Sequence, residues 1–293
     1  MHPIFPDIVQ NYPHLRLALL EAQTFDPSHF GFPEIYYQIM ESDQLRVSRF
    51  ADTFRQYNFF KNQVVCEAGI GRLALTQYYL PHVKKAYLIE NNPDLRPLIE
   101  KQIAQMGATH KTELIFADAR EVILPEPVDA LIGELMSIFC ANEFQVQIFR
   151  HLRQFLKSDG VMIPEKIVNT AQLCEADFPD HISHYPLCFT RHWPTMLALP
   201  AVVNTIDLRT INQTEESFST PMSCISPGSA NAILMNSHVH LSDRYAFTGT
   251  DSLMPPTVCK LTSPKTFRPG DMPILKSRIR YGTTLDDCRF SLE

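Results

Sequence analysis

The chain has 293 residues, of which 45% are hydrophobic and 20% charged, and its formal net charge is −6. This length and composition predict a globular protein with a sizeable core, in one large domain or two of ordinary size. The acidic balance argues against non-specific nucleic-acid binding, which requires a clustered basic surface.

The seven cysteines are scattered along the chain and none forms a CxxC pair. This pattern favours reduced thiols over a disulfide framework or a zinc site. The N-terminus lacks the basic and apolar runs of a signal peptide, and no stretch approaches the roughly 18 apolar residues of a membrane span. We therefore expect a cytoplasmic protein with neither a membrane nor a nucleic-acid partner.

The sequence of the first half predicts an irregular N-terminal segment, the lead-in, followed by alternating helices and strands. Residues 1–33 contain five prolines, which predicts an irregular segment, and residues 34–56 carry an apolar stripe at helical spacing. The predicted strands are 63–69, 86–90, 112–118, 128–134 and 159–167, and the predicted helices follow the first two strands and span 143–156. This alternation predicts a Rossmann-like, doubly wound parallel sheet over 34–166.

The composition of the sequence changes beyond residue 166, where prolines, serines and threonines become more frequent. Short β-rich runs such as 232–241 and 274–282 are separated by turn signals such as "SPG" and "RPGD". Runs of this kind predict antiparallel strands. We expect a smaller β-rich, barrel-like domain over 167–293.

A glycine pair follows the first predicted strand in "VVCEAGIG". Gly69 and Gly71 would let a ligand approach the backbone. Ala74 stands where the full dinucleotide pattern has a third glycine, so the pair by itself is also compatible with a tight strand-to-helix turn. Glu90 ends the second strand nineteen residues after Gly71, where doubly wound folds place an acid on the ribose hydroxyls.

The third predicted strand ends in "FADAR", at the same edge of the sheet. Asp118 there is placed to accept a hydrogen bond from an adenine amino group, and Ala119 follows it. Together with the glycine pair and Glu90, these residues predict a nucleoside-containing cofactor. They do not separate NAD from S-adenosylmethionine.

Two segments resemble known methyltransferases. "VVCEAGIGRLA" resembles the first motif of class I S-adenosylmethionine-dependent methyltransferases, with Glu67 in the place of the motif's first acid. "GELMSIFCANE" resembles the double-glutamate loop of the protein arginine methyltransferase family. Glu134, Met136 and Glu143 match that loop, whereas Leu135 stands where the family has tryptophan. The resemblance implies a methyltransferase domain with S-adenosylmethionine as its cofactor.

Flanking segments extend the resemblance over about residues 34–167. "FLKSDGVMIPEKI" is similar to the segment that follows the double-glutamate loop. Upstream, Met40, Asp43 and Arg46 match the family's M-x-x-D-x-x-R in the helix before the first strand. In the family this arginine pairs with the carboxylate of the cofactor's methionine moiety, and the resemblance implies the same role for Arg46.

The two glutamates suit a guanidino acceptor. A guanidinium is permanently protonated and therefore a poor nucleophile. Two carboxylates can grip its N–H groups, hold the positive charge on those nitrogens and leave the remaining nitrogen facing the methyl group. Glu134 and Glu143 are the candidates for this clamp, with Met40 and Met136 lining the methyl-transfer pocket. Each glutamate alone is also compatible with an ordinary strand end or helix start.

The second domain matches the family only loosely. The family's barrel carries a Thr-His-Trp loop that helps to close the acceptor pocket, whereas Pro255 and Pro256 stand in the aligned region. The resemblance places the family's dimerisation arm at about 175–200 and so implies a homodimer. The only tryptophan in the sequence, Trp193, lies in this region. The acceptor therefore stays open among free arginine, a guanidino metabolite, arginine in a peptide or protein, and another amine.

Other functions compete with this interpretation. A small-molecule amine or hydroxyl acceptor would keep the cofactor site unchanged, and a nicotinamide enzyme would leave Arg46 and the glutamate pair unexplained. A catalytically silent scaffold predicts damage to the glycine turn or to the glutamate pair, and the sequence shows neither. His238 and His240 alternate on a strand without a carboxylate or cysteine at ligand spacing, so we expect no metal site.

Overall fold

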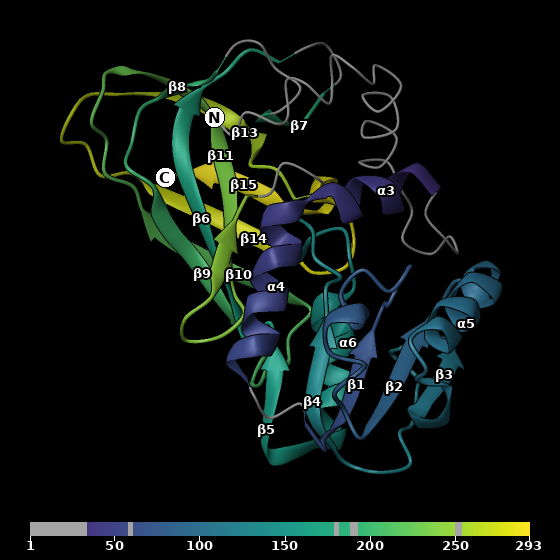
Figure 1. Cartoon of the computed structure of the whole chain (residues 1–293). Coiled ribbons are helices and arrows are strands. Elements are labelled where there is room, and N and C mark those ends of the chain that lie inside the picture. Colours follow the sequence, from purple (N-terminus) through teal and green to yellow (C-terminus); the bar gives the residue numbers. More distant parts are fainter. Residues whose placement is uncertain (1–33, 58–60, 179–181, 188–192, 250–253) are drawn as a thin grey trace.

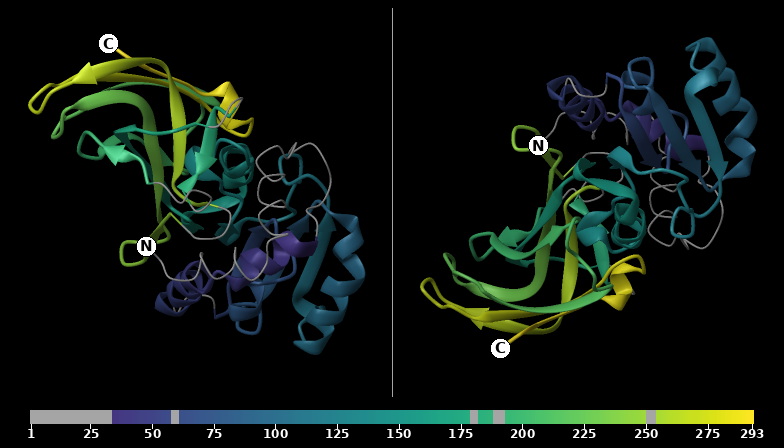
Figure 2. Two further views of the ribbon diagram at one scale, coloured as in Figure 1. Left: turned by 90° about the horizontal axis from the view of Figure 1, so that it is seen from above. Right: turned by 90° about the horizontal axis from the view of Figure 1, so that it is seen from below.

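The computed structural model describes residues 34–57, 61–178, 182–187, 193–249 and 254–293, and the predicted lead-in over 1–33 lies outside these residues. Figure 1 shows a parallel sheet with its helices on one side of the molecule and a curled set of antiparallel strands on the other. The two halves stand side by side in both views of Figure 2.

The first half is a five-stranded parallel sheet. Its strands are β1 (Val64–Ala68), β2 (Lys85–Glu90), β3 (Thr112–Phe116), β4 (Val128–Gly133) and β5 (Leu156–Ile163), in the order β3-β2-β1-β4-β5. All four neighbouring pairs are parallel, which confirms the predicted Rossmann-like fold. The strand order reverses beside β1, so the carboxyl ends of β1 and β4 flank the point where such folds bind ligands.

Helices connect these strands, with two departures from the prediction. They are α3 (Glu34–Ser42), α4 (Gln44–Gln56), η2 (Thr76–Tyr78), η3 (Pro93–Leu95), α5 (Arg96–Gln105), η4 (Thr109–Lys111), η5 (Ile138–Cys140), α6 (Gln145–Leu152) and η6 (Arg153–Phe155). The single helix expected over 34–56 is broken at Asp43, whose carboxylate accepts a hydrogen bond from the Arg46 backbone N–H at 3.1 Å and so caps a new helix.

The segment after β1 is the second departure. The regular helix expected there is replaced by turns and the short 3₁₀ helix η2. Leu73 has a φ of +65°, and this left-handed conformation interrupts a right-handed helix. A helix prediction based on apolar spacing alone is therefore wrong for this segment.

The second half is antiparallel. Its elements are β6 (Lys166–Glu175), β7 (His184–Pro186), β8 (Thr195–Met196), β9 (Ala201–Asp207), β10 (Glu215–Pro221), β11 (Gly228–His240), β12 (Ala246–Thr248), β13 (Thr257–Phe267), β14 (Ile274–Arg280), η8 (Leu285–Asp287) and β15 (Arg289–Leu292). One sheet has the order β7-β13-β11-β6-β8, with β9 on β6 and β12 on β11, and the other is β10-β14-β15.

The two antiparallel sheets form a barrel-like wall, because β9 contacts β10 and β13 contacts β15. This arrangement confirms the predicted β-rich fold of the second half. One hydrophobic core extends across both halves of the molecule, and the ring centroids of Phe139 and Phe290 lie 6.4 Å apart within it. The change from parallel to antiparallel pairing falls between Ile163 and Lys166. Among the described residues, no helix has the length and apolar content to span a membrane.

Candidate active site

A cavity of about 210 Å³ opens at the carboxyl edge of the parallel sheet. The elements around it are the ends of β1, β2, β3 and β4, the helices α3 and α4, and the start of α6. The structure brings all eleven site residues predicted from the sequence to this cavity: Met40, Arg46, Glu67, Gly69, Gly71, Glu90, Asp118, Ala119, Glu134, Met136 and Glu143.

The turn after β1 depends on its glycines. Gly69 has a φ of +71° and Gly71 a φ of +51°, both in the left-handed region that favours glycine. A Cβ atom on Gly69 would lie 2.3 Å from Cδ2 of Leu135, so a larger residue there would also have to displace that side chain. The bare backbone of this turn therefore forms one wall of the cavity.

Glu90 is bound to the same turn. Its carboxylate accepts hydrogen bonds from the backbone N–H groups of Gly71 and Asn92, each at 2.8 Å. Burial raises the pKa of Glu90 above its ordinary value, while these backbone donors oppose the shift. Each carboxylate oxygen can accept more than one hydrogen bond, so the group keeps the capacity to bind a ligand hydroxyl.

Glu67 lies deeper, at 2% exposure. Its Oε2 atom accepts hydrogen bonds from the hydroxyls of Thr76 at 2.6 Å and Tyr79 at 2.5 Å. Burial raises the pKa of Glu67 to about 7, and the two hydroxyl donors oppose this rise. The polar contacts of Glu67 thus tie the end of β1 to the irregular segment that follows it.

Asp118 is already paired. The guanidinium of Arg120 donates to both of its carboxylate oxygens, and these hydrogen bonds lower the pKa of Asp118. Arg120 lies 4.0 Å over the ring of Phe144, and both residues line the cavity. Arg120 was not among the predicted site residues, although it follows Asp118 and Ala119 directly in "FADAR".

Arg46 supplies the positive charge nearest to the glutamate pair. It is 6% exposed, and its Nη1 atom donates to Oε2 of Glu134 in a short ion pair. Its Nη2 atom donates to the carbonyl oxygen of Met40 at 2.6 Å. Burial acts to lower the pKa of Arg46, but the carboxylates of Glu134, Asp43 and Glu143 outweigh it and raise the pKa above its ordinary value.

Glu143 faces the same cluster from the start of α6. Burial, followed by the nearby charge of Glu134, raises the pKa of Glu143 to about 8, while Arg46 opposes the rise. This shift favours the protonated form of Glu143 near neutral pH. A cation that entered between the two glutamates would favour its ionised form. Both acids were predicted from the sequence, whereas the contact between Arg46 and Glu134 was not.

The two methionines occupy different positions. Met136 is 2% exposed, whereas Met40 is half-buried at the end of α3. The cavity also contains residues that the sequence analysis did not select, among them Tyr37, Glu41 and Arg72. Arg72 Nε lies 3.2 Å from Glu41 Oε1, and this pair had no motif to reveal it.

Pro255, Pro256 and Trp193, which lie in the segments that match the family least, do not line this cavity. Pro256 accepts a hydrogen bond from the Leu187 N–H at 2.8 Å through its carbonyl oxygen. Trp193 is 52% exposed just before β8, while residues 179–181 and 188–192 of the proposed arm lie outside the described residues. His238 and His240 belong to β11, and the described residues contain no cluster of three or more candidate metal ligands.

Comparison with known sequences finds arginine methyltransferases. The chain is 26% identical over 169 residues to the histone-arginine methyltransferase CARMER of Drosophila ananassae, which covers 55% of this chain and 32% of that protein. The matched part of this chain thus spans about a third of the length of such relatives. An uncharacterised protein of Methanocaldococcus jannaschii is 25% identical over 231 residues, or 78% of this chain and 86% of that one. No protein-family model matches the chain.

Comparison with solved structures finds the same fold. The Trypanosoma brucei PRMT1 enzyme–prozyme heterotetrameric complex with AdoHcy contains a chain that matches with a TM-score of 0.70 at 16% identity, over 86% of this chain and 89% of that one. Protein arginine methyltransferase 10 of Arabidopsis thaliana matches with a TM-score of 0.71 at 16% identity, over 84% and 87% of the two chains. The chain is thus similar in sequence to histone-arginine methyltransferases and shares the fold of these solved protein arginine methyltransferases.

Proposed function

We propose that the chain is an S-adenosylmethionine-dependent N-methyltransferase that acts on a guanidino nitrogen held between Glu134 and Glu143. One observation carries this proposal. Two acids from opposite ends of one loop share a cavity with a glycine turn and a buried arginine, Arg46. A nicotinamide enzyme gives no reason for this group of charges.

The cavity suits the cofactor in three places. Gly69 and Gly71 leave room for a ligand against the backbone, Glu90 keeps acceptor capacity for ribose hydroxyls, and Arg46 offers a guanidinium for a carboxylate. When bound, S-adenosylmethionine supplies a methyl group that is already activated by its sulfonium. We propose that residues 34–166 hold the cofactor and that 167–293 complete the acceptor site.

The residues of the chain would then align the acceptor and handle its proton. Glu134 and Glu143 would each accept hydrogen bonds from the guanidinium and fix its orientation. Glu143 starts protonated near neutral pH, so binding the cationic acceptor is coupled to loss of that proton. The ionised carboxylate is then placed to take the proton that the methylated nitrogen releases.

The relatives support an arginine-type acceptor. CARMER is named as a histone-arginine methyltransferase, and the matching PRMT1 structure is a complex with AdoHcy. We extend these properties to this chain as proposals, together with assembly as a homodimer and a cytoplasmic location. A small guanidino metabolite or another small amine is the second candidate acceptor, because Pro255 and Pro256 stand where the family's loop closes the acceptor pocket.

An acceptor screen tests the proposal. The chain is incubated with methyl-labelled S-adenosylmethionine and either free arginine, guanidino metabolites, arginine-rich peptides or simple amines, and the products are identified by mass spectrometry. We expect label on a guanidino nitrogen, and we expect Glu143→Gln to lower turnover about 100-fold or more because the acceptor loses its second anionic partner.

The matched control is Glu100→Gln, since Glu100 is an exposed acid on α5 that pairs with Arg96 at 3.6 Å. This control should keep wild-type turnover. Full activity in both Glu134→Gln and Glu143→Gln would refute the two-glutamate clamp. Absence of S-adenosylhomocysteine binding to the intact chain, measured by calorimetry, would refute the cofactor assignment.

A further inference from the structure

The loop between the two glutamates has an unfavourable backbone conformation. Phe139 and Cys140 have φ values of +58° and +53°, although neither is glycine. Residues with side chains persist in this left-handed region only where surrounding contacts hold them. Both side chains are fully buried, so the contacts that hold this loop lie inside the molecule.

Three of the holding contacts come from the antiparallel half. The Phe139 N–H donates to the Ser237 hydroxyl of β11 at 2.9 Å. The N–H groups of Gly282 and Thr283, in the turn between β14 and β15, donate to the carbonyl oxygens of Cys140 and Ala141 at 3.1 and 2.5 Å. Three consecutive residues of the loop are thus bonded to residues that lie more than ninety positions away in the chain.

Ser237 is itself held by a buried row of side chains. Its hydroxyl donates to Oδ1 of Asn169 at 2.7 Å, and Nδ2 of Asn169 donates to Oδ1 of Asn204 at 2.9 Å. Nδ2 of Asn204 donates to the Tyr281 hydroxyl at 2.8 Å, which in turn donates to Glu216 at 2.6 Å. Each hydrogen bond in this row fixes the orientation of the next group.

The direction of these bonds is settled by chemistry. Asn169 and Asn204 each use their amide nitrogen as donor and their amide oxygen as acceptor, and Ser237 accepts from a backbone N–H. Burial and the neighbouring carboxylate of Glu216 raise the pKa of Tyr281, so its hydroxyl stays protonated and remains a donor. Ser237 therefore has one arrangement available, with its oxygen facing the loop.

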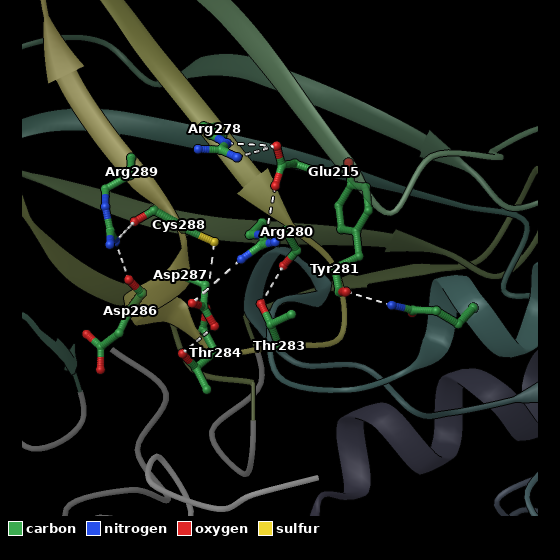
Figure 3. A network of polar contacts seen from close by, with 11 residues as sticks. Glu215, Arg278, Arg280, Tyr281, Thr283, Thr284, Asp286, Asp287, Cys288 and Arg289 are labelled. Atoms are coloured by element: carbon green, nitrogen blue, oxygen red, sulfur yellow. Dashed lines mark hydrogen bonds and ion pairs between the residues drawn. The ribbon is translucent and has the colours of Figure 1, made fainter. Parts of the chain in front are cut away.

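The turn that carries Gly282 and Thr283 is stiffened by its own contacts. Figure 3 shows the polar contacts around it, including Thr284 Oγ1 to Asp287 Oδ2 at 3.2 Å and Arg280 Nε to Glu215 Oε2 at 2.7 Å. The Tyr281 carbonyl also accepts a hydrogen bond from Gln147 of α6 at 2.6 Å. The same turn thus contacts both the loop and the helix that begins just after Glu143.

We propose that Ser237, through the row Asn169–Asn204–Tyr281, is a positioning residue that sets the separation and orientation of the two glutamates. This inference rests on the proposed function for its catalytic part. The antiparallel half would then act on the acceptor through the backbone of the loop, without placing Ser237 against the acceptor itself. On the cofactor side of the cavity, Gly71 and Glu90 are hydrogen-bonded to each other and take no part in this row.

The test compares two buried serines. Ser237→Ala removes the hydroxyl that faces the loop, whereas Ser277→Ala removes a hydroxyl at 2% exposure that makes no hydrogen bond within the described residues. We expect Ser237→Ala to lower kcat about 10- to 100-fold, with S-adenosylhomocysteine affinity unchanged, because small displacements of reacting groups have effects of that size. Ser277→Ala should keep the wild-type kcat. Tyr281→Phe, which interrupts the row with little change in volume, should lower kcat by a smaller factor.

A second readout needs no turnover. Hydrogen exchange measured by mass spectrometry should become faster in peptides that span 134–143 in Ser237→Ala and stay unchanged in Ser277→Ala, while peptides around Gly71 and Glu90 remain protected in both. The rising limb of kcat/KM with pH should also move to lower pH in Ser237→Ala, because a looser loop exposes Glu143 to water.

The outcomes separate the two proposals. Equal kcat and equal exchange in the Ser237→Ala and Ser277→Ala variants would overturn the positioning role of Ser237. A wild-type chain that binds S-adenosylhomocysteine but methylates no guanidino acceptor would overturn the proposed function. In that case faster exchange over 134–143 in Ser237→Ala would still support control of the loop by Ser237.

Discussion

Glu90 and Glu143 lie in one cavity but are held in different ways. Glu90 accepts hydrogen bonds from Gly71 and Asn92, which belong to the same strand–turn–strand unit. Glu143 follows a loop whose backbone is bonded to Ser237 and to the β14–β15 turn. Glu90 is therefore held by local contacts, whereas the loop before Glu143 is also held by contacts between the two halves of the molecule.

Only the locally held part of this site could be predicted from the sequence. Local contacts leave a spacing, such as nineteen residues from Gly71 to Glu90, that follows from the geometry of the fold. Contacts between distant segments have no characteristic sequence separation by which they could be recognised. Serine, asparagine and tyrosine occur throughout the second half, and nothing in the sequence distinguishes Ser237 from Ser277.

A large effect on cofactor affinity is expected for Arg46, which contacts both sides of the cavity. Arg46 pairs with Glu134 and is also the proposed partner of the cofactor's carboxylate. Arg46→Ala should weaken S-adenosylhomocysteine binding about 10- to 100-fold, because a charge-assisted hydrogen bond is lost. Arg46→Lys keeps the charge without the fork and should have an intermediate affinity by calorimetry. Unchanged affinity in Arg46→Ala would mean that Arg46 serves the acceptor side alone.

Most of the fold could be predicted from the sequence. For the site, the residues could be predicted but many of their contacts could not. Apolar strands alternating with helices predicted the parallel sheet, and the strand ends correctly brought Glu90, Asp118 and Glu134 to one edge. The break at Asp43 was missed because an N-cap interrupts an apolar stripe without removing it. The left-handed Leu73 was missed because spacing carries no information on the sign of φ.

A pH-dependent effect of medium size concerns the acceptor side. The pKa of Glu143 in the folded chain is about 8, above the unfolded value of about 4.3. The folded state therefore binds more protons between these values, so Glu143 lowers the stability of the folded state progressively as the pH rises through this window. Glu143→Gln removes this contribution. The difference in Tm, Glu143→Gln minus wild type, should therefore be more positive at about pH 9 than at about pH 5.

This pH comparison has an internal control. Glu67, whose pKa burial raises to about 7, is present in both proteins and cancels in the difference. For Glu100→Gln, on the exposed surface of α5, the difference in Tm between variant and wild type should be the same at both pH values. A difference for Glu143→Gln that does not change with pH would show that Glu143 is already ionised in the folded chain.

The smallest effects come from two glycines with similar backbone angles. Gly107, after α5, has a φ of +66° and no atom within 4 Å of the position that a Cβ would take, whereas a Cβ on Gly282 would lie 2.5 Å from Nε2 of Gln147. Gly107→Ala should lower the free energy of unfolding by about 1 kcal/mol and leave kcat unchanged. Gly282→Ala should lower both, since its turn holds the loop. Denaturant titration and kcat measurements on the two variants check this contrast, and equal kcat values would contradict it.

The change from parallel to antiparallel pairing between Ile163 and Lys166 has a consequence for how such a chain can evolve. Among the described residues, all those that line the cavity come from the segment before this point. The hydrogen-bond partners of Phe139, Cys140 and Ala141 in the antiparallel half all come after it. A gene that carried the first segment alone would transmit the binding chemistry without the geometry of the loop. Keeping the geometry of the site therefore requires both halves, although their folds are distinct.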